Sequence, residues 1–354
     1  MTFKMITAVI VLLLMAGSMD RVTAQSQSNN PAVENSIIII IHGDGDYLFH
    51  NRKGESFLAD QVVLRKALKV SEQLDNAEVF IFHQKKRDFS LLVFPKDDAD
   101  FYYYKNGKLK EHISFNRSRF DLSEEADLYK KYSSGSSKNL LLYYGHEIPL
   151  DGGNGYNSSY PGNQFNLSLF SQAMRNISDG NTFDLIVLST CGNGSPSVIK
   201  ELSPYSEYII ASPDDLHLSY MNPLYLKRLN YYREYNFEDF VVDFARSSFT
   251  ELKRNIETGS VISAYKTSEL SPEFLENYND GGAITDSEFT IIENCDCADL
   301  DGFNSEEASK GAIVFYNPPS FGKEKYKTEH SGWGCKKSIS YTTSSLIEKV
   351  MHSK

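Results

Sequence analysis

Two segments of the sequence place a histidine and a cysteine directly after apolar runs. Residues 140–147 read LLLYYGHE and carry His146, and residues 183–191 read FDLIVLSTC and end on Cys191. A thiol is a strong nucleophile, and a neighbouring imidazole can assist it and later protonate a leaving amine. The two residue types therefore predict acyl transfer through a covalent acyl-enzyme, provided that the fold brings them together.

The main alternative is that Cys191 only fills space, since a single buried cysteine at the end of a strand is usually a packing residue. His42 and His83 also follow apolar runs. We interpret both as hydrogen-bonded structural residues, which is the commoner role of a histidine at a strand end. HGDGD, residues 42–46, is interpreted as a tight turn. A calcium or oxyanion loop is the alternative for it, and no Gly-x-Ser-x-Gly elbow supports an α/β-hydrolase.

Apolar runs alternate with amphipathic segments over most of the chain, which is typical of a parallel sheet covered by helices. We predict an α/β fold with a mostly parallel central sheet flanked by helices, a β-hairpin excursion within 89–115 and a β-rich C-terminal extension. The expected strands are 36–41, 77–82, 139–144, 183–190, 207–211 and 260–265. The expected helices are 56–74, 167–177, 196–202, 237–255 and the closing segment 344–354.

Such a sheet tells us where a ligand should bind, because ligands of open parallel sheets lie at the carboxyl ends of the strands. If the strands at 139–144 and 183–190 are direct neighbours, their ends lie about 5 Å apart. His146 is then beside Cys191, and His42 lies one strand further away, at about 10 Å.

The residues around these strand ends favour the same chemistry. Ser195 and Pro196 mark the start of a helix, whose unpaired N–H groups favour a thiolate at Cys191. Gly145 and Gly192 allow the backbone to approach a substrate carbonyl. The oxyanion of the tetrahedral intermediate is expected to accept hydrogen bonds from backbone amides at these two strand ends.

The first 24 residues have the features of an export signal. Lys4 precedes an apolar run at 5–17, and residues 22–24 supply the small-residue cleavage pattern. This run is shorter than the roughly 20 residues that span a bilayer, so we expect no membrane span and a secreted or periplasmic protein. Removal of residues 1–24 leaves 34 Lys and Arg (36 minus 2) against 46 Asp and Glu (47 minus 1), a net charge of −12. This charge argues against a nucleic-acid partner.

The other cysteines, Cys295, Cys297 and Cys335, lie far from Cys191 in the sequence. In an oxidising compartment Cys335 is expected to pair with Cys295 or Cys297, closing a loop of about 40 residues and stabilising the fold by about 4 kcal/mol. Zinc held by these cysteines with His330 is the alternative, although the spacing matches no common zinc site. We expect no cofactor, and the sequence does not support calcium.

The two apolar blocks, one ending in His146 and the other 45 residues later on Cys191, resemble the bipartite motif of the clostripain family of cysteine peptidases. IIIIIHGDGDYL, from residue 37, is similar to that family's first strand and Gly-Asp turn. YSEYIIASPDDLHLSYMNP, from residue 205, is similar to the strand and loop that flank its specificity pocket. The resemblance covers about residues 36–266. It implies a caspase-like fold and a cysteine endopeptidase with a peptide or protein substrate.

The resemblance implies that Cys191 is the nucleophile and His146 the proton donor, with oxyanion donors in the amides of Cys191 and Glu147 and backbone access at Gly192. Glu147 stands where typical members have glycine, so its side chain must point away or contact substrate. Ser189 stands where typical members have an aspartate at the base of a pocket for Arg or Lys, so the resemblance does not imply strict cleavage after basic residues.

Ser212, Asp214 and Asp215 complete the expected substrate-binding residues, and either aspartate can restore negative charge to the pocket. The expected organisation is a signal peptide at 1–24, a caspase-like peptidase domain at 25–270 and a C-terminal extension at 271–354. Two other functions are open. One is a catalytically inactive caspase-fold protein that binds a partner, and the other is a transpeptidase or amidase that uses the same acyl-enzyme.

Overall fold

The computed structural model describes residues 33–43, 47–50, 54–85, 89–90, 94–95, 98–117, 120–153, 156–157, 160–216, 219–232, 237–278 and 290–340. The predicted export signal, residues 44–46 of the predicted turn and the predicted closing helix at 344–354 lie outside these residues. Within the described part of the chain, no helix is both long and apolar enough to cross a bilayer.

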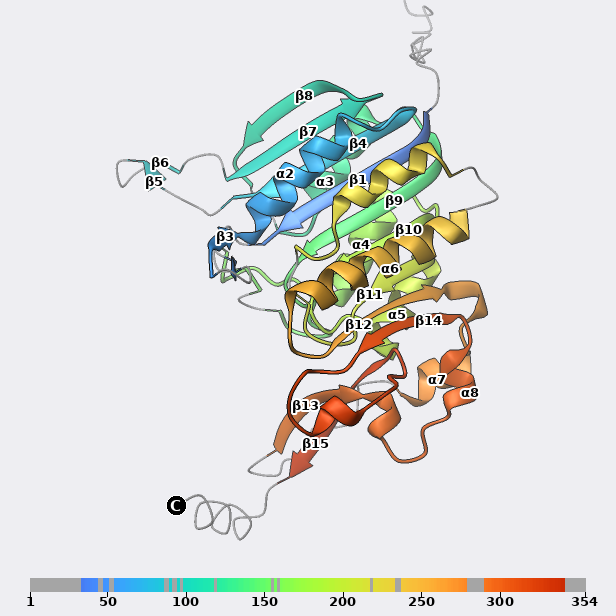
Figure 1. The fold of residues 1–354 in the computed structure, drawn as a ribbon. Helices are drawn as coiled ribbons and strands as arrows, with labels where there is room; N and C mark the ends of the chain where they lie inside the picture. Colours follow the sequence, from blue (N-terminus) through green and yellow to red (C-terminus); the bar gives the residue numbers. More distant parts are fainter. Residues whose placement is uncertain are drawn as a thin grey trace, which may run out of the picture. The chain divides into compact units, whose positions relative to one another are not determined.

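A nine-stranded sheet is the centre of the fold, with the strand order β14-β12-β11-β10-β9-β1-β4-β7-β8 (Figure 1). The strands are β1 (Val33–His42), β4 (Ala77–Gln84), β7 (Ala99–Lys105), β8 (Lys108–Phe115), β9 (Ser136–Gly145), β10 (Phe183–Ser189), β11 (Ser206–Ala211), β12 (Ser260–Lys266) and β14 (Ala312–Asn317). The five strands from β11 to β4 are parallel, whereas the two strands at each edge are antiparallel. The predicted mostly parallel sheet and its β-hairpin excursion are confirmed.

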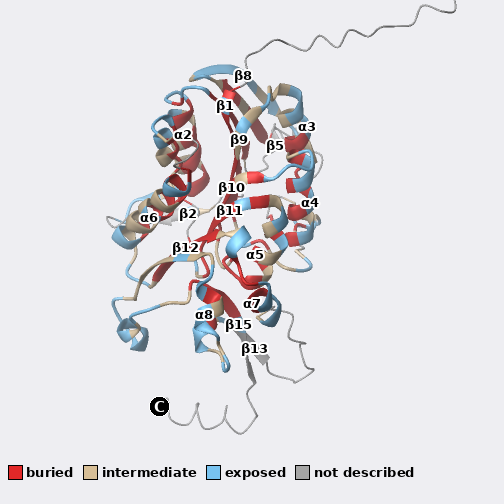
Figure 2. Cartoon of the chain, turned by 90° about the vertical axis from the view of Figure 1, so that its right-hand side faces the viewer, coloured by how far each residue is buried: buried red, intermediate tan, exposed pale blue. Residues whose placement is uncertain are grey.

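Helices cover both faces of this sheet (Figure 2). α2 (Ala59–Ser71) and α6 (Phe237–Asn255) lie on one face, and α3 (Ser123–Tyr132), α4 (Leu167–Ile177) and α5 (Pro196–Leu202) lie on the other. Because side chains alternate along a strand, the isoleucines of β1 divide between two cores. Ile37, Ile39 and Ile41 pack on the α2 and α6 side, and Ile38 and Ile40 on the opposite side.

The helix predicted from residue 56 begins only at Ala59. Residues 56–58 form the short strand β3 (Ser56–Leu58), which pairs with β2 (Leu48–His50). The pairing with β2 supplies hydrogen bonds for the backbone of residues 56–58, and Leu58 is still extended where it precedes the helix. The helix therefore starts later than predicted. A further short pair, β5 (Phe89–Ser90) and β6 (Phe94–Pro95), lies outside the main sheet.

The C-terminal region contains α7 (Pro272–Asn277), β13 (Thr290–Asp296), α8 (Ser305–Ser309), β14 and β15 (Gly334–Ser340). β14 pairs with β12 and so extends the central sheet, while β13 and β15 form a separate antiparallel pair. Cys297 and Cys335 form a disulfide, which decides between the two expected pairings. The disulfide also joins two of the side chains that the zinc alternative required.

The two histidines interpreted as structural are indeed buried and hydrogen-bonded. His83 Nε2 lies 3.0 Å from Asp60 Oδ2. His42 Nε2 lies 3.2 Å from Glu125 Oε1, to which Arg117 also donates a hydrogen bond. The cluster of His42, Glu125 and Arg117 joins the end of β1 to α3 and to the segment after β8, on the sheet face opposite α2.

The buried Glu125 is expected to make stability fall at acid pH. Burial alone would raise its pKa, but the charges of Arg117 and His42 and their hydrogen bonds lower the pKa to about 2. An unfolded glutamate titrates near pH 4.3, so this group stabilises the fold above that pH and loses its contribution as the pH falls towards 2. The shift corresponds to about 3 kcal/mol of unfolding free energy.

Urea unfolding at a series of pH values will test this. The difference between the wild type and Glu125→Gln should be greatest near neutral pH and shrink towards pH 2. Glu111→Gln, which changes an exposed residue of β8, is the matched control and should show a small, pH-independent difference. A constant difference between wild type and Glu125→Gln would contradict the prediction.

Candidate active site

The two strands that lead to the candidate catalytic residues are neighbours in the sheet. β9 and β10 pair in parallel, with Tyr144 opposite Ser189 at their carboxyl ends. His146 follows β9 and Cys191 follows β10 by one or two residues. The predicted pairing of these strands is therefore confirmed, and β1 is the next strand beyond β9, as expected.

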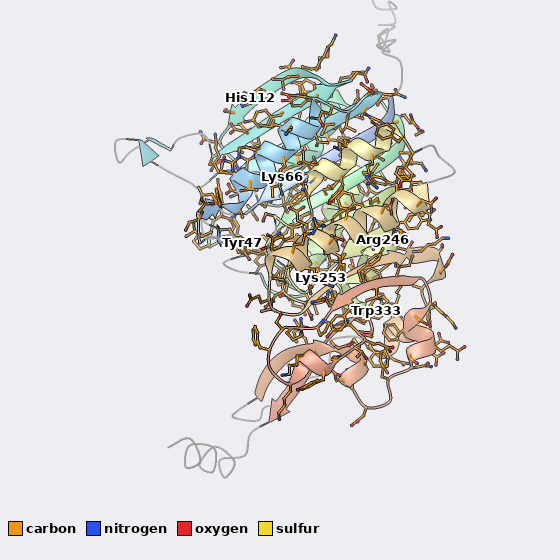
Figure 3. All side chains as sticks on the ribbon, in the orientation of Figure 1. Tyr47, Lys66, His112, Arg246, Lys253 and Trp333 are labelled. Atoms are coloured by element: carbon orange, nitrogen blue, oxygen red, sulfur yellow. A yellow bond between two sulfur atoms is a disulfide. The ribbon has the colours of Figure 1, made fainter. Side chains whose placement is uncertain are left out.

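The sulfur of Cys191 is half-buried and receives contacts from two other loops. The backbone N–H of Leu216 donates to Sγ at 3.3 Å, and the thiol donates to the carbonyl of the same residue at 3.3 Å. The phenol of Tyr47 lies near the thiol, and each of the two groups affects the pKa of the other. Tyr47 precedes β2 and lies near the end of the sheet where β3 is found (Figure 3).

The imidazole of His146 makes edge-to-face contacts with two tyrosine rings. Its centroid lies 5.0 Å from that of Tyr47 and 6.1 Å from that of Tyr156, with interplanar angles of 78° and 87°. The Tyr156 hydroxyl also donates to the carbonyl of His146 at 3.2 Å. Tyr47 therefore contacts His146 and lies near Cys191.

The packing explains the glycine that precedes His146. A Cβ at Gly145 would lie 2.9 Å from the hydroxyl of Tyr156 and 2.9 Å from Cε1 of Tyr143. The close approach of these two tyrosines is therefore sufficient reason for a glycine at this position.

Asn193 holds the histidine loop and the cysteine loop together. Its side-chain oxygen accepts from the N–H of Ile148 at 3.0 Å, and its amide donates to the carbonyl of Ile148 at 3.1 Å. Thr190 donates to the same oxygen at 2.6 Å. Asn193 is buried, so these bonds are shielded from water and fix the segment after His146 relative to Cys191.

The electrostatic environment does not favour a thiolate, in contrast to the expectation from the helix start. α5 does begin at Pro196, with the side chain of Ser195 accepting from Val198 N–H. However, burial raises the pKa of Cys191, and the negative charges of Asp215 and Glu147 raise it further. The hydrogen bonds that lower this pKa do not compensate.

The three expected carboxylates have different positions. The Glu147 carboxyl group lies against Gly192, where an added Cβ would be 3.0 Å from Glu147 Cδ, so this side chain does not point away from the site. Asp215 acts electrostatically on Cys191, whereas the Asp214 carboxylate lies 3.9 Å from His330. Asp215 is thus the aspartate whose charge reaches the sulfur.

Gly192 and Ser212 shape the loops around the sulfur. Gly192 has a φ of +61°, which favours glycine, and its N–H donates to the carbonyl of Asp214 at 3.1 Å. Its amide therefore holds the neighbouring loop. Ser212 is fully buried and donates to the carbonyl of Val261 at 2.8 Å. This hydrogen bond holds the loop after β11 against β12, and Ser189 is fully buried as well.

The C-terminal region supports two loops of the site, the loop that follows Cys191 and the loop that follows β11. Gly334 N–H donates to the carbonyl of Gly194 at 3.1 Å, and Asn294 donates to the carbonyl of Pro213 at 2.9 Å. Trp333, in the same C-terminal region (Figure 3), is buried, and its indole N–H donates to the carbonyl of Ala308. The segment after residue 271 is therefore part of the scaffold of the site.

Sequence reasoning missed Tyr47, Tyr156 and Asn193. Tyr47 follows the turn after the first strand, and Asn193 lies two residues after the cysteine, so their proximity to a predicted strand end was an available signal. Tyr156 lies within a glycine- and asparagine-rich loop, where no local pattern indicates its contact with the histidine.

The fold of this chain is similar to that of cysteine proteases of known structure. The chain shares its fold with a secreted C11 (clostripain-family) cysteine protease from Bacteroides thetaiotaomicron in complex with an irreversible peptide inhibitor, with a TM-score of 0.50 and 14% identity over 70% of this chain and 68% of that one. A second structure of a secreted C11 protease from that organism, iotapain, gives a TM-score of 0.50 and 12% identity over 70% and 69% of the two chains. The caspase-like fold is confirmed. No protein-family model matches the sequence, and no curated protein is detectably similar to it.

Proposed function

We propose that this protein is an exported cysteine peptidase that hydrolyses peptide bonds through an acyl-enzyme on Cys191. The observation that carries the proposal is the pairing of β9 with β10, which brings His146 and Cys191 to neighbouring strand ends, where the ring of Tyr47 contacts His146. Export is supported by the pattern of the first 24 residues and by the disulfide, which is typical of oxidising compartments.

In the proposed reaction His146 accepts the thiol proton as Sγ attacks the carbonyl carbon of the scissile bond. The oxyanion that forms accepts hydrogen bonds from the backbone amides of Cys191 and Glu147. His146 then donates the proton to the departing amine, which leaves an acyl-enzyme that water hydrolyses. The negative charges of Glu147 and Asp215 favour substrates with a cationic side chain near this bond.

A peptide library tests the proposal directly. The purified protein should cleave a defined subset of peptides, and treatment with iodoacetamide should abolish cleavage as the alkyl group appears on Cys191 by mass spectrometry. Substrate peptide added before iodoacetamide should protect this thiol. A folded protein that cleaves no member of the library would overturn the peptidase proposal.

The second candidate function is a catalytically inactive protein that uses this fold to bind a partner. The observation that favours it is the raised pKa of Cys191, since burial beside two carboxylates keeps the sulfur as a thiol. A non-catalytic protein should bind peptides without cleaving them. Release of new amino termini, or its absence, therefore separates the two functions, and added amine nucleophiles reveal any transpeptidase activity.

A further inference from the structure

The loop after β1 delivers a third side chain to the proposed catalytic pair. We propose that Tyr47 is an active-site residue whose hydroxyl donates a hydrogen bond to the sulfur of Cys191 while its ring orients the imidazole of His146. The consequence for peptide cleavage rests on the proposed function, whereas the hydrogen bond to the sulfur can be tested by itself.

The first step of the argument is that Tyr47 is held in place and remains a donor. Its half-buried ring packs against the core on the α2 and α6 side of the sheet. Burial raises the pKa of Tyr47 to about 12, and negative charge on Cys191 and Asp215 contributes to the increase. The hydroxyl therefore keeps its proton over the pH range in which a cysteine titrates.

The second step concerns the charges that face the sulfur. The carboxylates of Asp215 and Glu147 oppose a negative charge on it, and burial opposes it as well. The N–H of Leu216 and the hydroxyl of Tyr47 act in the other direction. Hydrogen bonds to a charged acceptor are stronger than those to a neutral one, so both donors gain strength as negative charge develops during nucleophilic attack.

The third step concerns the proton acceptor. A His146 ring in edge-to-face contact with both Tyr47 and Tyr156 has few orientations open to it. Edge-to-face aromatic contacts of this kind add modest stability beyond the burial of the rings. Because Tyr47 contacts the sulfur through its hydroxyl and the imidazole through its ring, two substitutions can separate the two roles.

The experiment measures the rate at which iodoacetamide alkylates Cys191 from pH 5 to 11. Tyr47→Phe keeps the ring and removes the donor, so alkylation at pH 7 should slow about tenfold and its midpoint should rise by about one pH unit. Above the midpoint the rates of variant and wild type should converge. Tyr231→Phe, in an exposed tyrosine, is the matched control and should retain the wild-type profile. Peptide mapping separates this reaction from alkylation of Cys295, and Cys191→Ala supplies its background.

A Tyr47→Phe profile that superimposes on the wild type would overturn the proposal, and so would faster alkylation, which would make Tyr47 a cover over the thiol. Tyr47→Leu removes the ring too, and should lower kcat for peptide cleavage further than Tyr47→Phe does. Equal kcat values for the two variants would overturn the role of the ring. If Tyr47→Phe shifts the alkylation profile but the wild type cleaves no peptide, the proposed function is overturned and the hydrogen bond is supported. If the wild type cleaves peptides but the profile is not shifted, the hydrogen bond is overturned and the proposed function is supported.

Discussion

Replacing Cys191 with alanine should reduce peptide hydrolysis by more than about 1,000-fold, because no other group in the proposed reaction can form the acyl-enzyme. His146→Ala should cause a loss of about 100- to 10,000-fold, since the thiol would then need solvent to accept its proton. The raised pKa of Cys191 makes this dependence stronger, because little thiolate is present at neutral pH without a base. Initial rates on a peptide from the library provide the measurement.

The two substitutions should not be additive, because both remove parts of one proton transfer. The double variant should therefore be about as slow as Cys191→Ala alone. Cys295→Ala is the matched cysteine control, and it should retain wild-type activity since this residue lies outside the disulfide. Substantial hydrolysis by the Cys191→Ala protein would show that another group is the nucleophile.

Removal of the disulfide is expected to have the largest effect on stability. Cys297 and Cys335 are 38 residues apart, and a loop of that length is worth about 4 kcal/mol on the chain-entropy account. The double variant Cys297→Ser, Cys335→Ser should lose about this much unfolding free energy in urea. Because Gly334 next to the disulfide donates to the loop after Cys191, the variant should also lose peptidase activity before it unfolds globally.

Cys295 again provides the control for this experiment. It lies directly opposite Cys335 in the ladder between β13 and β15, although it is not bonded to it. Cys295→Ser should therefore change the unfolding free energy by less than about 1 kcal/mol. If this single substitution instead had the large effect, the disulfide would join Cys295 to Cys335, and a digest under non-reducing conditions would show that pair.

Many elements of the fold can be predicted from local patterns in the sequence. The helices at 167–177, 196–202 and 237–255 begin and end where they were predicted, because apolar periodicity and end signals such as Ser195 and Pro196 agree. The central strands were equally clear as continuous apolar runs. Helix α3 was missed because its buried positions include Glu125, a charged residue whose burial depends on the distant Arg117.

The sequence by itself determined the candidate nucleophile, its histidine and the class of sheet that could join them, since an apolar strand specifies both its own burial and where its end must lie. Only the tertiary structure decided that Tyr47 contacts His146, that Asn193 joins the two loops and that Asp215 is the aspartate that acts on the sulfur. The physical reason is that such contacts form between loops far apart in the chain. Their geometry depends on how several elements pack together, and no local periodicity encodes it.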